Sequence, residues 1–144
     1  MSCILSIETS TDVCSVAMSE NGQCIFKKED HSGPNHAVSL GVFVDEALSF
    51  TDNHAIPLGA VAVSQGPGSY TGLRIGVSMA KGICYGRDVP LLAVPTLEVM
   101  AVPVLLNHEI EEDLFERGQC VPGVLCHLEF HLYRYAYRAE EDGE

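Results

Sequence analysis

Residues 66–76 read GPGSYTGLRIG and stand between a short apolar segment at 58–64 and a segment of helical spacing at 73–85. Glycines placed after a buried strand and before a helix permit a sharp chain reversal and a close approach of backbones. Such a turn either holds an anion at the helix N-terminus or lets the helix pack tightly on the sheet or on a second helix. The residues alone leave both uses open. The segment is not a Walker A loop, and its spacing differs from the Gly-x-Gly-x-x-Gly dinucleotide fingerprint.

Upstream of this turn, the chain has the pattern of three strands followed by a helix. The strands are predicted at 3–8, 13–19 and 23–28. Asn21-Gly22 predicts a tight hairpin between the last two, because both residues tolerate positive φ. A helix is predicted over 36–50 from its apolar spacing, with Asn35 as its N-cap.

Downstream of residue 85, the chain alternates strand and helix again. A short buried strand is predicted at 90–94, followed by a helix at 97–106 that Thr96 caps and Pro103 bends or ends. An antiparallel meander followed by β-α-β-α units predicts an α/β fold, with a mixed five-stranded sheet and helices on its faces.

The composition excludes several classes of protein. Of 144 residues, 47% are apolar and 19% charged, which is typical of one globular domain. Acidic residues outnumber basic ones 20 to 8, so the chain lacks the basic footprint of a protein that grips nucleic acid by itself. No apolar run reaches the roughly 18 residues of a membrane span, and the first residues lack a basic leader. Six cysteines without a Cys-x-x-Cys pair indicate reduced thiols in a cytoplasmic protein.

A second motif, IETSTD at residues 7–12, ends the first predicted strand. A tight turn with hydroxyls and an acid can hold a phosphate or its magnesium through turn amides and side-chain oxygens. The turn has no glycine, and Thr11 and Asp12 could equally satisfy local amides. Together with the glycine-rich turn, the candidate phosphate-binding residues are Thr9, Ser10, Thr11, Asp12, Gly68 and Ser69.

Neither a catalytic set nor a metal site can be identified from the residues. Cys120, Cys126, His127 and His131 are metal-ligand types, but their spacing matches no standard zinc pattern. His36 is expected on the surface near the start of a helix rather than in a catalytic role. We therefore expect no catalytic residue, no metal and no cofactor.

Residues 3–19 (CILSIETSTDVCSVAMS) and 64–101 (beginning SQGPGSYTGLRIG) resemble the TsaB (YeaZ) family. The resemblance covers residues 1 to about 113 and implies a ribonuclease-H-like lobe of the actin/sugar-kinase (ASKHA) fold. The related TsaD family opens similarly, but it has a His-x-x-x-His pair shortly after the strand that corresponds to 91–94. Here that place reads VPTLE, at residues 94–98.

The resemblance implies a non-catalytic scaffold in the synthesis of threonylcarbamoyladenosine beside the tRNA anticodon. Its implied partners are a TsaD-type catalytic subunit, a TsaE-type ATPase and a second copy of the chain, with tRNA contacted only indirectly and no membrane involved. The pairing helices correspond to 36–50 and 71–86. The candidate partner-binding residues are Val38, Val42, Tyr70, Gly72, Leu73, Gly76 and Ala80.

The chain departs from the family at residues 114–144, which contain no Ser, Thr, Asn, Lys or Ile. We divide the chain into a TsaB-like lobe, 1–113, and an atypical tail, 114–144. We hypothesise that the tail derives from a frameshift or a truncated second lobe. Two alternatives stay open: an ATP-binding phosphotransferase or ATPase that uses Glu8, Asp12 and the 66–72 turn, and an inactive truncated product.

Overall fold

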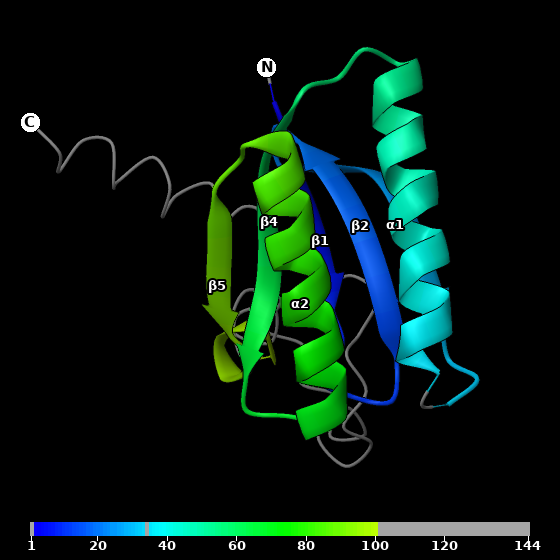
Figure 1. Ribbon diagram of the computed structural model, residues 1–144, viewed down its shortest axis with the longest axis vertical. Coiled ribbons are helices and arrows are strands. Elements are labelled where there is room, and N and C mark those ends of the chain that lie inside the picture. Colours follow the sequence, from blue (N-terminus) through cyan, green and yellow to red (C-terminus); the bar gives the residue numbers. More distant parts are fainter. Residues whose placement is uncertain (1, 34, 101–144) are drawn as a thin grey trace, which may run out of the picture.

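A mixed sheet of five strands carries the part of the chain that the computed structural model describes, residues 2–33 and 35–100 (Figure 1). The strands lie in the order β3-β2-β1-β4-β5. β1 and β3 flank β2 as antiparallel neighbours, whereas β1, β4 and β5 run parallel. The predicted α/β topology is therefore confirmed. The bounds are β1 Cys3–Glu8, β2 Cys14–Glu20, β3 Gln23–Asp30, β4 Leu58–Gly66 and β5 Leu91–Pro95.

The hairpin between β2 and β3 turns where the sequence predicted. Asn21 and Gly22 have φ angles of 54° and 76°, the positive values that a two-residue hairpin of this hand requires. Glu20 pairs with Gln23 directly across the turn. The ladder continues to Asp30, two residues beyond the predicted end of the third strand.

Two helices, α1 (His36–Asn53) and α2 (Tyr70–Arg87), cover the same face of this sheet (Figure 1). α1 packs mainly on β2, and α2 mainly on β4. Asn35 stands at the N-cap of α1 as predicted, but its side chain makes no capping hydrogen bond. α2 begins at Tyr70 rather than at residue 73, because Ser69 Oγ accepts a hydrogen bond from the Gly72 amide at 3.2 Å and caps the helix there.

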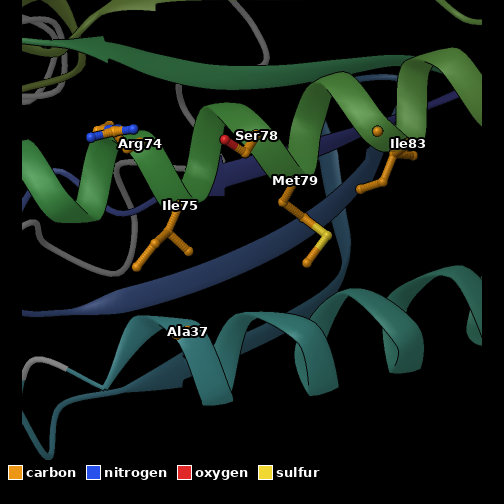
Figure 2. A pocket seen from close by; sticks show the side chains of 7 residues that line it. Ala37, Arg74, Ile75, Ser78, Met79 and Ile83 are labelled. Carbon is orange, nitrogen blue, oxygen red and sulfur yellow. The ribbon is translucent and has the colours of Figure 1, made fainter.

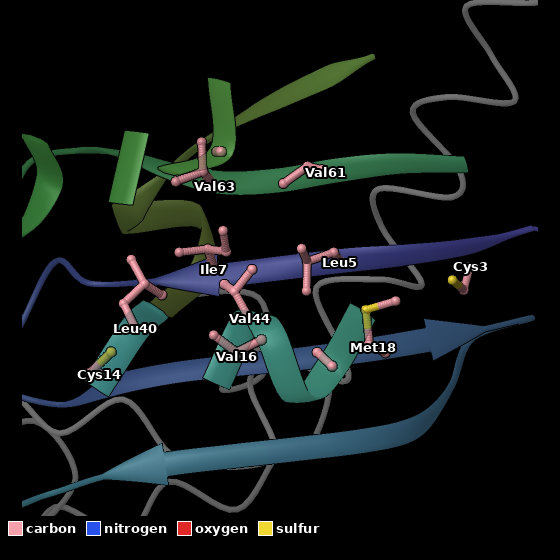
Figure 3. Packing of buried hydrophobic residues seen from close by; sticks show 12 residues of the cluster. Cys3, Leu5, Ile7, Cys14, Val16, Met18, Leu40, Val44, Val61 and Val63 are labelled. Carbon is pink, nitrogen blue, oxygen red and sulfur yellow. The ribbon is translucent and has the colours of Figure 1, made fainter. Parts of the chain in front are cut away.

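The hydrophobic core lies between the sheet and these two helices (Figure 3). Alternate residues of β1 and β2 point to one face, so Leu5, Ile7, Val16 and Met18 form one cluster with Leu40 of α1. Each of these five side chains is at most 1% exposed, and burying one such side chain contributes about 1.5–3 kcal/mol. This packing fixes the places of α1 and α2 on the sheet.

Within the described residues, Cys14, Cys24 and Cys84 are free thiols. Burial, with a smaller contribution from the charge of Asp30, raises the pKa of Cys14 to about 11, so its thiol stays protonated at neutral pH. Neither helix in the described ranges has the length and apolar character that a membrane crossing needs.

The end of the described chain is helical over 96–100, as predicted from Thr96. The rest of that predicted helix, the boundary at 113, the tail and its Cys and His residues lie outside the described residues.

Asp30 joins the end of β3 to the first turn of α1. Its carboxylate accepts hydrogen bonds from the Ser32 hydroxyl and amide and from the Ser39 hydroxyl. These bonds lower the pKa of Asp30 from its ordinary 3.8 to about 2. The side-chain hydrogen bonds from Ser32 and Ser39 contribute most to this shift. The ionised form of Asp30 is therefore favoured by the folded state.

Asp30 should make folding sensitive to acid. Because its pKa is lower in the folded state, its contribution is complete above about pH 4 and is lost as the pH falls towards 2. We expect Asp30→Asn to lower the melting temperature at pH 7 and to have a much smaller effect near pH 2. Thermal unfolding of both proteins across this pH range measures the difference. Asp45→Asn, which changes an exposed aspartate of α1, is the control; an equal effect of both variants would refute a special role for Asp30.

Candidate partner-docking surface

The two motifs singled out from the sequence meet beside the N-terminus of α2. The Ser69 amide donates to the Ser10 carbonyl at 2.7 Å, and the Thr9 hydroxyl donates to the Gly72 carbonyl at 2.7 Å. A Cβ on Gly68 would lie 2.6 Å from the Ser10 carbonyl oxygen. The structure therefore brings together four of the six candidate phosphate residues, Thr9, Ser10, Gly68 and Ser69.

The hydrogen-bonding groups of these motifs are largely engaged within the protein. Beyond the bonds just described, the Ser10 amide donates to Glu8 Oε1 at 2.7 Å, and the Val13 amide donates to Thr11 Oγ1 at 3.3 Å. Asp12 is exposed. A phosphate that used the amides of Ser10 and Ser69 would have to displace existing bonds. Phosphate binding here stays a prediction, and the geometry favours a tight structural joint.

Glu8 ends β1 as a buried carboxylate that is 1% exposed. Its Oε2 accepts a hydrogen bond from the Ser64 hydroxyl of β4, while Oε1 accepts the Ser10 amide. Glu8 thus links β1, its following turn and the parallel strand β4. Because buried carboxylates are tolerated when they accept hydrogen bonds, the arrangement gives Glu8 a structural role.

His36 corrects an expectation, because it is 5% exposed rather than a surface residue. Its Nε2 lies 2.6 Å from the Thr11 carbonyl oxygen, and Nε2 must donate because a carbonyl can only accept. Its Cδ2 lies 3.0 Å from where a Gly72 Cβ would stand. The first residue of α1 therefore touches both the β1–β2 turn and α2.

The stripe of small residues on α2 also needs a correction. The sequence predicted that Gly72, Gly76 and Ala80 contact a partner helix. In the structure, all three are buried within the chain itself. A Cβ on Gly76 would lie 2.3 Å from Thr9 Oγ1 at the end of β1. The stripe brings α2 close to the sheet, so a larger side chain at Gly76 would disturb the fold rather than a docked partner.

Three large apolar side chains of the helix pair are exposed to solvent. Val38 and Val42 on α1 are 64% and 52% exposed, and Tyr70 at the start of α2 is 74% exposed. Leu73, also among the candidate partner residues, is half-buried. Exposed apolar side chains gathered on one face mark sites of protein interaction.

An interhelical groove of about 660 Å³ lies along α2, next to the first turn of α1. It is lined by Ala37 of α1 and by Arg74, Ile75, Ser78, Met79, Gly82 and Ile83 of α2. In Figure 2, Ile75 and Met79 point from α2 towards α1, whereas Arg74 and Ser78 line the same groove farther from α1. The groove together with Val38, Val42 and Tyr70 is called the docking surface below.

Sequence reasoning missed the apolar row of this groove, Ile75, Met79 and Ile83. Their spacing of four residues was a usable signal, since it places all three on one helix face. A second hollow of about 650 Å³ lies on the other side of α2, beside the turn from Gln65 to Gly68. Arg74 lines both hollows.

The two helices of the docking surface are tied together at both ends. At their N-terminal ends, His36 lies against Gly72. At the opposite ends, Arg87 of α2 donates to both carboxylate oxygens of Asp52 of α1, at 3.0 and 2.8 Å. This pairing lowers the pKa of Asp52 and raises the pKa of Arg87, in each case chiefly through the hydrogen bond. These contacts join α1 to α2 at both ends of the helix pair.

The fold and this surface define a ribonuclease-H-like lobe of the ASKHA class, whose hydroxyl-rich turn is closed by internal bonds. Comparison with known proteins gives the same class. The family model of tRNA N6-adenosine threonylcarbamoyltransferase, TsaD, matches residues 30–114. The solved structure of YeaZ from Pseudomonas aeruginosa superposes with a TM-score of 0.64 at 29% identity, covering 75% of this chain and 50% of that chain.

Two curated relatives, both TsaB proteins, identify the family within this class. The tRNA threonylcarbamoyladenosine biosynthesis protein TsaB of Haemophilus influenzae is 32% identical over 108 residues, which are 75% of this chain and 45% of that protein. The TsaB protein of Bacillus subtilis is 36% identical over 123 residues, which are 84% and 54% of the two chains. The chain belongs to the TsaB (YeaZ) family. It spans about half the length of the curated relatives it matches.

Proposed function

We propose that the chain is a TsaB-type scaffold that binds a TsaD-type catalytic subunit through the docking surface. The assembly would be the cytoplasmic machinery that transfers threonylcarbamoyl to the adenosine beside the tRNA anticodon. In this proposal the chain supplies no catalytic group and no cofactor. A TsaE-type ATPase joins the assembly, and tRNA is contacted only through the partners.

The observation that carries the proposal is the apolar and preformed character of the docking surface. Val38 and Val42 on α1 and Tyr70 on α2 stay exposed, although exposing three large apolar side chains to water is unfavourable. The ties at both helix ends mean that little ordering has to accompany docking, which favours affinity.

Two further features support a scaffold over a phosphotransferase. In the turn that could cradle a phosphate, the Thr9 hydroxyl and the Ser10 carbonyl are bonded to residues at the start of α2, and the Ser10 amide is bonded to Glu8. The formal charge of −12 also disfavours direct contact with RNA, so contacts to tRNA phosphates are assigned to the partner. The names of the curated TsaB relatives support the same pathway.

Val42→Glu should weaken binding to a TsaD-type subunit by at least about tenfold. The substitution would introduce a charge at a position that is 52% exposed in the free chain and becomes buried in the proposed complex. Isothermal titration calorimetry of wild type and variant against the purified subunit measures the effect. Because Val42 is exposed in the free chain, its circular dichroism spectrum should not change.

Leu97→Glu is the matched control, since Leu97 is 62% exposed but follows β5 and lies outside α1 and α2. It should bind as the wild type does. Absence of any binding by the wild-type chain would contradict the proposed function, and equal affinities of wild type and Val42→Glu would contradict the docking surface. Sedimentation velocity of the chain alone tests whether the same face pairs two copies.

A further inference from the structure

The outward face of α2 carries a row of polar and aromatic residues next to the apolar row of the groove. Tyr70, Arg74, Ser78, Lys81 and Tyr85 follow each other at spacings of three or four residues, so they share one side of the helix. All five are exposed. Two of them, Arg74 and Lys81, are positively charged in a chain with 20 acidic residues.

These two cations differ from the other Lys and Arg residues in the described ranges. Lys27, Lys28 and Arg87 pair with Glu29, Glu46 and Asp52 at 3.4, 3.0 and 2.8 Å. Within residues 2–33 and 35–100, neither Arg74 nor Lys81 has an ion pair. The cations without an acidic partner are thus both on the helix of the docking surface.

Arg74 is held in place by an aromatic neighbour instead of an acid. Its Nη1 lies 3.3 Å from the Tyr70 hydroxyl oxygen, and its Cζ lies 5.4 Å from the centre of the Tyr70 ring. A cation–π contact orders the guanidinium while leaving its charge uncompensated. Arginine and tyrosine in such positions are the residues that most often carry binding energy at protein interfaces.

We propose that Arg74 and Lys81 bind carboxylates on an amphipathic helix of the TsaD-type subunit, whose apolar side chains fill the groove along Ile75 and Met79. This inference rests on the proposed function and adds the chemistry by which the partner is selected. A second copy of the chain is a poorer occupant, because it would bring together two molecules that each carry a formal charge of −12.

The double variant Arg74→Gln, Lys81→Gln should bind the TsaD-type subunit about tenfold or more weakly at about 50 mM salt. At about 500 mM salt, where exposed charges are screened, its affinity and that of the wild type should converge. Titration calorimetry of the full chain at both salt concentrations measures this. Arg74→Lys with Lys81 unchanged keeps both charges and should retain most of the affinity.

The control is the double variant Lys27→Gln, Lys28→Gln. It also removes two positive charges, but from β3, where both lysines already have acidic partners. It should leave binding within about twofold of the wild type. If the wild type binds and the Arg74/Lys81 variant binds with the same affinity, this inference is overturned but the proposed function stands. No binding by the wild type overturns both. The inference is also overturned if both double variants lose affinity for the TsaD-type subunit to the same extent. It is overturned likewise if the Arg74/Lys81 variant loses self-association but still binds the TsaD-type subunit as the wild type does.

Discussion

Replacing Gly72 with alanine is expected to destabilise the protein by about 3 kcal/mol. The new Cβ would stand 2.1 Å from the Thr9 carbonyl oxygen, a backbone atom that cannot rotate away. α2 would have to move outward, which would break the bond from the Thr9 hydroxyl to the Gly72 carbonyl and the bond from the Ser69 amide to the Ser10 carbonyl. Urea unfolding of wild type and variant measures the loss as a lower midpoint at constant slope.

Gly82→Ala supplies the matched control on the same helix. A Cβ at this position would meet no atom within 4 Å. Alanine in an exposed helix interior is favoured over glycine by about 0.5–1 kcal/mol, so this variant should be slightly more stable than the wild type. Similar unfolding free energies for the two alanine variants would show that α2 does not approach β1 as closely as described.

Local sequence patterns were sufficient to predict the strands, the hairpin and the order of elements. Asn21-Gly22 acts through its own backbone angles, so its turn needs no information from distant residues. The start of α2 was missed because the glycine-rich turn looked non-helical up to Gly72. The Ser69 hydroxyl caps the helix at Tyr70 and makes Gly72 part of its first turn.

The use of the glycine-rich motif could not be predicted, because spacing identifies which residues share a helix face but not what that face meets. Gly72, Gly76 and Ala80 suit a partner helix and a sheet equally well. Thr9, which lies 63 residues before Gly72 in the chain, decides the matter by occupying the space beside them.

The same limit explains His36 and the groove. A histidine in the first turn of a helix is commonly exposed, but the β1–β2 turn, 25 residues earlier in the chain, and Gly72 of α2 bury His36. The spacing of Ile75, Met79 and Ile83 shows a shared face, and all three do pack against the core. That the same row also lines a groove does not follow from its spacing. Which faces α1 and α2 leave outward is set by their packing on β2 and β4.

Glu8→Ala is expected to lower the free energy of unfolding by about 3 kcal/mol. The substitution would leave two buried donors, the Ser10 amide and the Ser64 hydroxyl, without the carboxylate that accepts them now. An unsatisfied buried donor costs about 1–3 kcal/mol, and the deleted side chain also leaves a cavity. Glu8→Gln keeps the shape and one acceptor oxygen, so it should cost clearly less. Chemical unfolding of both variants measures the difference.

Asp12→Ala is the control in the same turn, because Asp12 is an exposed carboxylate and should change stability by less than about 0.5 kcal/mol. The variants at Glu8 and Asp12 also test the phosphotransferase alternative, in which these two carboxylates bind magnesium-ATP. A structural Glu8 predicts that calorimetric titration of the folded wild-type chain with magnesium-ATP gives no saturable binding. Saturable binding that Asp12→Ala abolishes at unchanged stability would instead assign the turn to nucleotide chemistry, and the carboxylates at its two ends would then have to be read as part of an active site.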